Sequence, residues 1–249
     1  MKFASKPGLQ KQIQGLVILL AFLAPACQLT NLNLPRVKNH TPPEFNLNTT
    51  GFDDSSCPEQ NGLRICKPDG ALGQNGCEQL RLPGEVLSGL QPAYPLRVCL
   101  LRSNSGQPLA EGEFIYREGC LMSEYVRYAV FEDSQLKILK SIADLQQTYA
   151  PVESEDEALS YALAATGLGV RYGLSAQNDL RYFVGKLEDT NVQQIPQGYQ
   201  VHLFDYKVCG CGPHPTYAVD VLITSDGQVR ELSREKIYED PAEDQLCVD

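Results

Sequence analysis

The residues with the most evident chemical potential lie in one short turn, Cys209-Gly210-Cys211-Gly212-Pro213-His214-Pro215. Two thiolates and an imidazole could ligate zinc or copper here, with Cys247 or another residue completing the set. Alternatively, the cysteines pair with distant partners, or Cys209 and Cys211 form a strained, redox-active ring. We expect distant disulfides and no cofactor, because exported thiols are normally oxidised and no CxxC motif accompanies the turn.

The nine cysteines are spread along the chain and do not form two CxxC pairs, which favours disulfides over a zinc ribbon. Five of the eight that follow Cys27 lie before residue 121 and three lie after residue 208. Both numbers are odd, so complete pairing requires at least one bridge between the two halves. The disulfide candidates are Cys57, Cys66, Cys77, Cys99, Cys120, Cys209, Cys211 and Cys247.

The amino terminus has the pattern of a signal peptide, which we predict over residues 1–26. Lys2, Lys6 and Lys11 precede an apolar stretch, and Ala24-Pro25-Ala26 offers small residues for cleavage. The apolar stretch is about 12 residues long, whereas a transmembrane helix needs roughly 20. Export therefore explains this segment better than a permanent membrane span.

The run Leu23-Ala24-Pro25-Ala26-Cys27 resembles the lipobox of bacterial lipoproteins. The family prefers Leu three residues before the cysteine, where this chain has Ala24. The resemblance implies that Cys27 becomes the first mature residue and carries a lipid, which would be the only attachment to a membrane. The alternative is a secreted protein cut after Ala26, and either reading places the mature chain in the cell envelope or outside the cell.

Charge excludes some partners. The chain has 21 Lys and Arg against 31 Asp and Glu, and removing the three lysines of the signal peptide leaves a formal charge of about −13. Such a surface repels phosphate backbones and anionic lipid, so we expect no nucleic acid and no direct electrostatic binding to membranes.

Before residue 151 the mature chain divides into two parts. Residues 27–56 hold the anchor cysteine and a polar stretch without apolar periodicity, which we interpret as a flexible tether. Residues 57–150 begin with a Cys-rich loop segment. Three runs there, 96–101, 113–116 and 125–131, have the β-branched and aromatic composition of antiparallel strands, and Ser141 can cap a short helix that ends near Tyr149.

Residues 151–249 begin with the clearest helix signals in the chain. Ser154 and Glu157 form a capping box, and Gly167 stands where a left-handed C-cap residue belongs. Strand patterns follow at 192–195, 199–208, 216–224 and 229–232. In the second of these both faces carry apolar side chains, so something must cover each face for part of its length.

A helix followed by an antiparallel meander resembles the cystatin-like and NTF2-like folds over roughly the last 100 residues. The sequence as a whole predicts an α+β protein, with antiparallel sheets, a few packed helices and disulfides, after a signal peptide and a tether. We expect the two halves to be tied by a disulfide.

Catalytic motifs are missing from the sequence. It contains no Gly-x-Ser-x-Gly or His-Glu-x-x-His pattern, and its three histidines, His40, His202 and His214, lie in the predicted tether, a strand and the turn. We therefore expect a non-enzymatic envelope or secreted protein that binds an unidentified protein or small molecule or has a structural role. The alternatives are a redox or metal-handling protein that uses Cys209, Cys211 and His214, and a hydrolase with unrecognised carboxylates.

Overall fold

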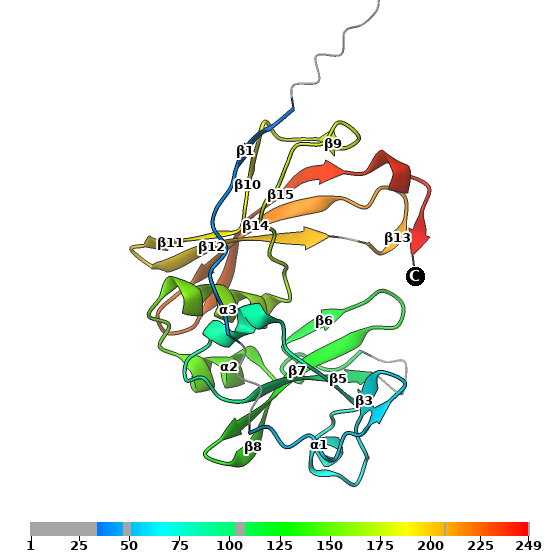
Figure 1. Ribbon diagram of the computed structural model, residues 1–249, viewed down its shortest axis with the longest axis vertical. Coiled ribbons are helices and arrows are strands. Elements are labelled where there is room, and N and C mark those ends of the chain that lie inside the picture. The colour runs from blue at the N-terminus through cyan, green and yellow to red at the C-terminus, as the bar shows by residue number, and fades with distance from the viewer. Residues whose placement is uncertain (1–33, 47–50, 103–107, 207, 249) are drawn as a thin grey trace, which may run out of the picture. The chain divides into compact units, whose positions relative to one another are not determined.

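A central helix, α3 (Glu155–Thr166), lies between two mainly antiparallel sheets (Figure 1). The computed structural model describes residues 34–46, 51–102, 108–206 and 208–248; the predicted signal peptide, Cys27 and residues 28–33 of the tether lie outside them. The α+β class predicted from the sequence is confirmed, and the described chain from Leu34 onward belongs to one compact unit.

Both capping predictions for the helices are confirmed. The Ser154 hydroxyl accepts a hydrogen bond from the Glu157 amide, and the Glu157 carboxylate accepts one from the Ser154 amide. Gly167 ends α3 with φ of 68°, a left-handed conformation that glycine adopts without steric cost. Helix α2 (Ile142–Tyr149) begins after Ser141 with a second capping box, in which Asp144 takes the place of Glu.

The first sheet has the strand order β2-β3-β4-β5-β7-β6, with β8 also paired to β7. The predicted strand at 113–116 is displaced, because pairing with β7 starts only at Tyr116 and Phe114 instead packs edge-on against Tyr125. The bounds are β2 (Glu59–Gln60), β3 (Leu63–Ile65), β4 (Gln79–Arg81), β5 (Leu96–Arg102), β6 (Tyr116–Glu118), β7 (Glu124–Glu132) and β8 (Gln135–Leu139).

The second sheet follows α3 and has the order β11-β12-β14-β15-β9. Its last long strand extends seven residues past the predicted Leu232. The sequence does not predict this extension because four of these seven residues are charged, which hides the strand pattern. The bounds are β9 (Arg181–Tyr182), β11 (Asn191–Ile195), β12 (Gly198–Tyr206), β14 (Thr216–Ile223) and β15 (Val229–Glu239).

The remaining elements are short. The helical ones are α1 (Ala71–Gln74) and two 3-10 turns, η1 (Glu85–Gly89) and η2 (Pro241–Glu243). The strands form two small ribbons outside the sheets: β13 (Gly210–Cys211) pairs antiparallel with β16 (Cys247–Val248), and β1 (Arg36–Lys38) pairs parallel with β10 (Lys186–Glu188).

One hydrophobic core joins the two halves of the chain through α3. Tyr128 of the first sheet donates a hydrogen bond to the Ala164 carbonyl, and Tyr161 donates to the Gly227 carbonyl at the end of the second sheet. The small residues of α3, Ala158, Ala162 and Ala164, are fully buried. Close approach of both sheets to the helix explains why this face carries alanine instead of larger side chains.

Both faces of strand β12 pack against other elements, as its apolar pattern predicts. Val201 and Leu203 point into the core beneath α3, whereas Phe204 on the opposite, outer face clusters with Leu187 and Val37 of the β1–β10 ribbon. The ribbon therefore lies across the outer face of the second sheet.

The ribbon also corrects the predicted tether. Residues 36–38, expected to be flexible, form a parallel strand whose register runs from Arg36–Lys186 to Lys38–Glu188. This strand could not be predicted from the sequence, because its pairing partner lies about 150 residues away and only Val37 of the three residues is apolar.

Candidate functional site

The Cys209–Pro215 turn does not form the chemical centre that its composition allows. Cys209 pairs with Cys120, and Cys211 pairs with Cys247. A sulfur in a disulfide is no longer a thiolate, so neither cysteine is a zinc or copper ligand in this state. The proposed Cys209–Cys211 redox ring is wrong for the same reason, because both sulfurs have other partners.

His214 of the same turn is buried, with 1% of its surface exposed. Its Nε2 lies 3.1 Å from the Leu246 carbonyl oxygen, to which it donates. The imidazole therefore fastens the C-terminal segment beside the Cys211–Cys247 bridge. Within the described ranges, no group of three or more His, Cys, Asp and Glu side chains could hold a metal ion.

The remaining candidate cysteines form the other two bridges, Cys57–Cys66 and Cys77–Cys99. All eight cysteines after Cys27 are thus paired, and Cys120–Cys209 is the bridge between the halves that the odd counts require. It links the β6–β7 hairpin of the first sheet to the segment before β13 (Figure 1). Four disulfides indicate an oxidising environment outside the cytoplasm.

A hydrogen-bonded row of polar side chains lies instead on the outer face of the second sheet. His202 of β12 stands directly opposite Asp220 of β14, and the imidazole Nδ1 lies 2.7 Å from Asp220 Oδ1. The hydroxyl of Ser233, on β15, donates to Asp220 Oδ2 at 2.9 Å. Three neighbouring strands thus contribute one side chain each to a continuous hydrogen-bonded row.

The row fixes the state of Asp220. The hydrogen bond from His202 lowers the pKa of the Asp220 carboxyl; burial opposes this shift, and the Ser233 hydroxyl adds to it. An ionised Asp220 can only accept the hydrogen bond, so Nδ1 of His202 carries the proton. Nε2 of His202 is then the nitrogen that is left for other contacts. Ser233 bonds to the carboxylate and not to the imidazole, so the three residues do not form a Ser–His nucleophile pair.

A cavity of about 470 Å³ opens beside His202, between the outer face of the sheet and the segment that leads into β10. We call it the outer cavity. Its walls combine aromatic and aliphatic side chains with a few charged groups: Phe183, Val184, Gly185, Lys186, Leu187, Glu188, His202, Phe204, Ala218, Glu235 and Ile237. A hollow that combines apolar walls with a few charged groups and an oriented imidazole is typical of a site for a small ligand.

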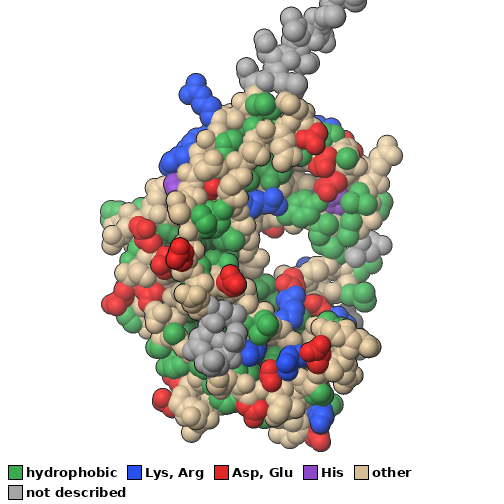
Figure 2. All heavy atoms as spheres, in the orientation of Figure 1, with side chains coloured by type: hydrophobic (Ala, Val, Ile, Leu, Met, Phe, Trp, Pro, Cys, Tyr) green, Lys and Arg blue, Asp and Glu red, His purple; other side chains and the backbone are tan. Residues whose placement is uncertain are grey.

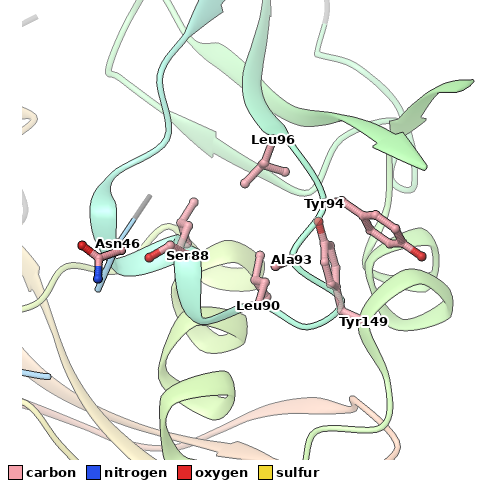
Figure 3. A pocket seen from close by; sticks show the side chains of 8 residues that line it. Asn46, Ser88, Leu90, Ala93, Tyr94, Leu96 and Tyr149 are labelled. Carbon is pink, nitrogen blue, oxygen red and sulfur yellow. The ribbon is translucent and has the colours of Figure 1, made fainter. Parts of the chain in front are cut away.

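A second hollow is too small for such a ligand (Figure 3). It lies between Leu90, Tyr94 and Tyr149 and measures about 40 Å³, room for on the order of one to three water molecules.

No family model, curated protein or solved structure matches this chain. Function must therefore be argued from the site itself. None of the helices in the described part of the chain is long and apolar enough to cross a membrane.

Two adjacent carboxylates, Asp189 and Glu188, hold the β1–β10 ribbon in place over the outer cavity. Neither belongs to a motif that could be recognised in the sequence. Asp189 is completely buried and accepts hydrogen bonds from the Gly173, Leu174 and His40 amides and from the Asn39 side chain. Burial alone would raise the pKa of Asp189, but these bonds outweigh it and lower the pKa.

Glu188 is the second of the two carboxylates. It accepts hydrogen bonds from Lys186, Lys38 and His40, all three within ion-pair distance. Burial opposes ionisation, but the three donors together lower the pKa of Glu188 to about 2. His40, expected in a flexible tether, is thus part of the body.

This shift predicts a loss of stability in acid. Glu188 takes up its proton near the ordinary value of 4.5 in the unfolded chain but only near 2 in the folded chain, so the unfolded state binds more protons between these values. We expect the free energy of unfolding to fall as the pH is lowered from about 4.5 towards 2, as measured by urea denaturation at a series of pH values. Glu188→Gln should be less stable at pH 6 and show a flatter decline below pH 4.5. An unchanged decline in this variant would assign the effect to other carboxylates.

Proposed function

We propose that this chain is an exported, non-enzymatic protein of the cell envelope, anchored by a lipid on Cys27, that binds a small ligand in the outer cavity. The supporting observation is that the eight cysteines after Cys27 are all consumed in four disulfides, which leaves Cys27 alone available for lipidation. An oxidising compartment and a single cysteine left over by the four disulfides, directly after a predicted cleavage site, both fit a lipoprotein.

The anchor can be tested by intact mass. Protein extracted from membranes of the producing cells should begin at Cys27, carry a diacylglycerol or triacyl adduct and contain no free thiol. A Cys27→Ala variant should lose the adduct and leave the membrane fraction. A full-length, fully reduced chain in the cytoplasm would overturn the proposal.

Ligand binding in the outer cavity can be tested with Nile red, an uncharged apolar fluorophore. Ala218 lies in the cavity wall on β14, so Ala218→Trp should fill the space and weaken Nile red binding by at least tenfold. Ala71→Trp is the matched control, because Ala71 is exposed at the start of α1, in the part of the chain that packs on the first sheet. Equal affinity in both variants would exclude the cavity as the binding site.

His202 gives a second readout. The chain has three histidines, so their NMR ring signals can be assigned by single substitution. Nile red should shift the His202 signal and leave that of the buried His214 unchanged. A shift of all three signals would indicate a global change and not occupation of the cavity.

A further inference from the structure

The β1–β10 ribbon has two chemically different faces. Because opposite residues in the register share a face, Val37 and Leu187 point together toward the second sheet, where they join Phe204 in a hydrophobic cluster. Arg36, Lys38, Lys186 and Glu188 form the other two register pairs and point away from this cluster, and Lys186 and Glu188 also border the outer cavity. We call these three cations the basic ribbon face.

This face runs against the charge of the chain, which is −10. Lys38 and Lys186 are 53% and 60% exposed, and both share one carboxylate, Glu188. With Arg36 also exposed, this face carries three cations and one anion, Glu188. Figure 2 shows Lys and Arg side chains gathered on the side of the molecule where β1 and β10 run in Figure 1.

Two partly exposed apolar side chains lie next to the ribbon strands in the sequence, and one of them, Phe183, also lines the outer cavity. Leu34 and Phe183 are 39% and 48% exposed, and the ammonium of Lys236 lies 3.9 Å from the centre of the Phe183 ring. The Arg36 amide donates to the Gly185 carbonyl, which places Leu34 beside the Phe183–Gly185 segment. An exposed aromatic ring beside a cation is common on protein surfaces that rest in the headgroup region of a bilayer.

Chain length then restricts where this face can be. Only seven peptide steps separate Cys27 from Leu34, and a chain that long reaches at most about 25 Å. A compact body of roughly 200 residues has a radius of gyration of about 16 Å, so the reach is shorter than the body is wide. A lipid on Cys27 would hold the edge that starts at Leu34 close to the bilayer.

We propose that the basic ribbon face, with Leu34 and Phe183, docks on anionic lipid headgroups and orients the anchored body on its membrane. The inference rests on the lipid anchor proposed above. It replaces the expectation, drawn from net charge, that the body makes no electrostatic contact with a membrane. The charge of the docking face, and not the net charge of the chain, determines contact with the membrane, because potentials beyond a Debye length of about 8 Å are screened at physiological salt.

The chain has no tryptophan, so a single introduced one reports its own surroundings. The test uses the secreted, oxidised mature chain with Cys27→Ser, which has no lipid, and vesicles of phosphatidylglycerol and phosphatidylethanolamine. Phe183→Trp should shift its emission to shorter wavelength and be quenched by brominated phosphatidylglycerol. Leu63→Trp, on β3 of the first sheet where Leu63 is 50% exposed, should show neither effect.

Charge variants separate lipid recognition from hydrophobic adsorption. In the Phe183→Trp background, Arg36→Gln with Lys186→Gln should weaken vesicle binding by about tenfold, since each cation near an anionic surface contributes and Lys186 is partly neutralised. Lys67→Gln with Arg117→Gln removes two exposed cations outside the ribbon and should change binding less than twofold. Equal losses in the two pairs, equal binding to phosphatidylcholine vesicles, or equal responses of the two tryptophans would overturn docking.

The proposal of a lipid anchor and the proposal of a docking face can be refuted independently. Vesicle binding by the Cys27→Ser chain does not depend on lipidation, so it can succeed while intact mass shows no adduct on the native protein. A lipidated native protein whose Cys27→Ser form ignores anionic vesicles would retain the anchor and refute the docking face.

Discussion

Replacing Cys120 and Cys209 together by alanine should lower the free energy of unfolding by about 4.5 kcal/mol, the largest loss expected from any one bridge. The bridge spans 89 residues of sequence, and in the chain-entropy description the stabilisation grows with the logarithm of the loop that is closed. Cys120 is half-buried and Cys209 exposed, so their removal opens little cavity in the core. Urea denaturation of the oxidised variants measures the effect.

The Cys211–Cys247 bridge is the matched control. Both of its cysteines are also exposed, but the bridge spans only 36 residues. Its removal should cost roughly 0.8 kcal/mol less by the same relation. A larger loss from Cys211→Ala with Cys247→Ala would show that local geometry, and not closure of the chain, decides what these bridges contribute.

Local signals in the sequence predict the elements that depend on near neighbours. The Ser154–Glu157 capping box needs residues only three apart, and Gly167 needs only its own lack of a side chain, so both are readable without knowledge of the fold. The apolar pattern of β12 likewise predicts cover on both faces, because side-chain alternation is a property of the strand itself.

Long-range pairing is what the sequence does not reveal. Odd counts require a bridge between the halves, but nothing in composition selects Cys120–Cys209 among the possible pairs. The His202–Asp220 contact depends on the register between β12 and β14, and the connection between them is too long for a turn type to fix it. Asp189 looks like an ordinary surface acid until the chain places five hydrogen bonds around it.

That buried carboxylate carries the second large prediction. Asp189→Ala should destabilise the protein by roughly 3 kcal/mol, because it removes the acceptor from several backbone and side-chain donors that remain in a poorly solvated place. It should also release the β1–β10 ribbon before the rest unfolds, since Asp189 joins residues 39–40 to the 173–174 loop. In Asp189→Ala, hydrogen exchange at the Arg36 amide should therefore be faster than in the unaltered protein, and should increase more than exchange at the amides of β12.

Asp189→Asn tests whether charge or shape holds the ribbon. The amide keeps one oxygen acceptor but turns an NH₂ toward donors, so it should recover only part of the lost stability. Asp179→Ala is the control for removal of an acid from the same stretch of chain, because Asp179 is exposed, and it should change the free energy of unfolding by less than about 0.5 kcal/mol. Equal exchange at Arg36 in Asp189→Ala and in the unaltered protein would mean that the hydrophobic contact of Val37 and Leu187, and not the buried carboxylate, holds the ribbon on the sheet.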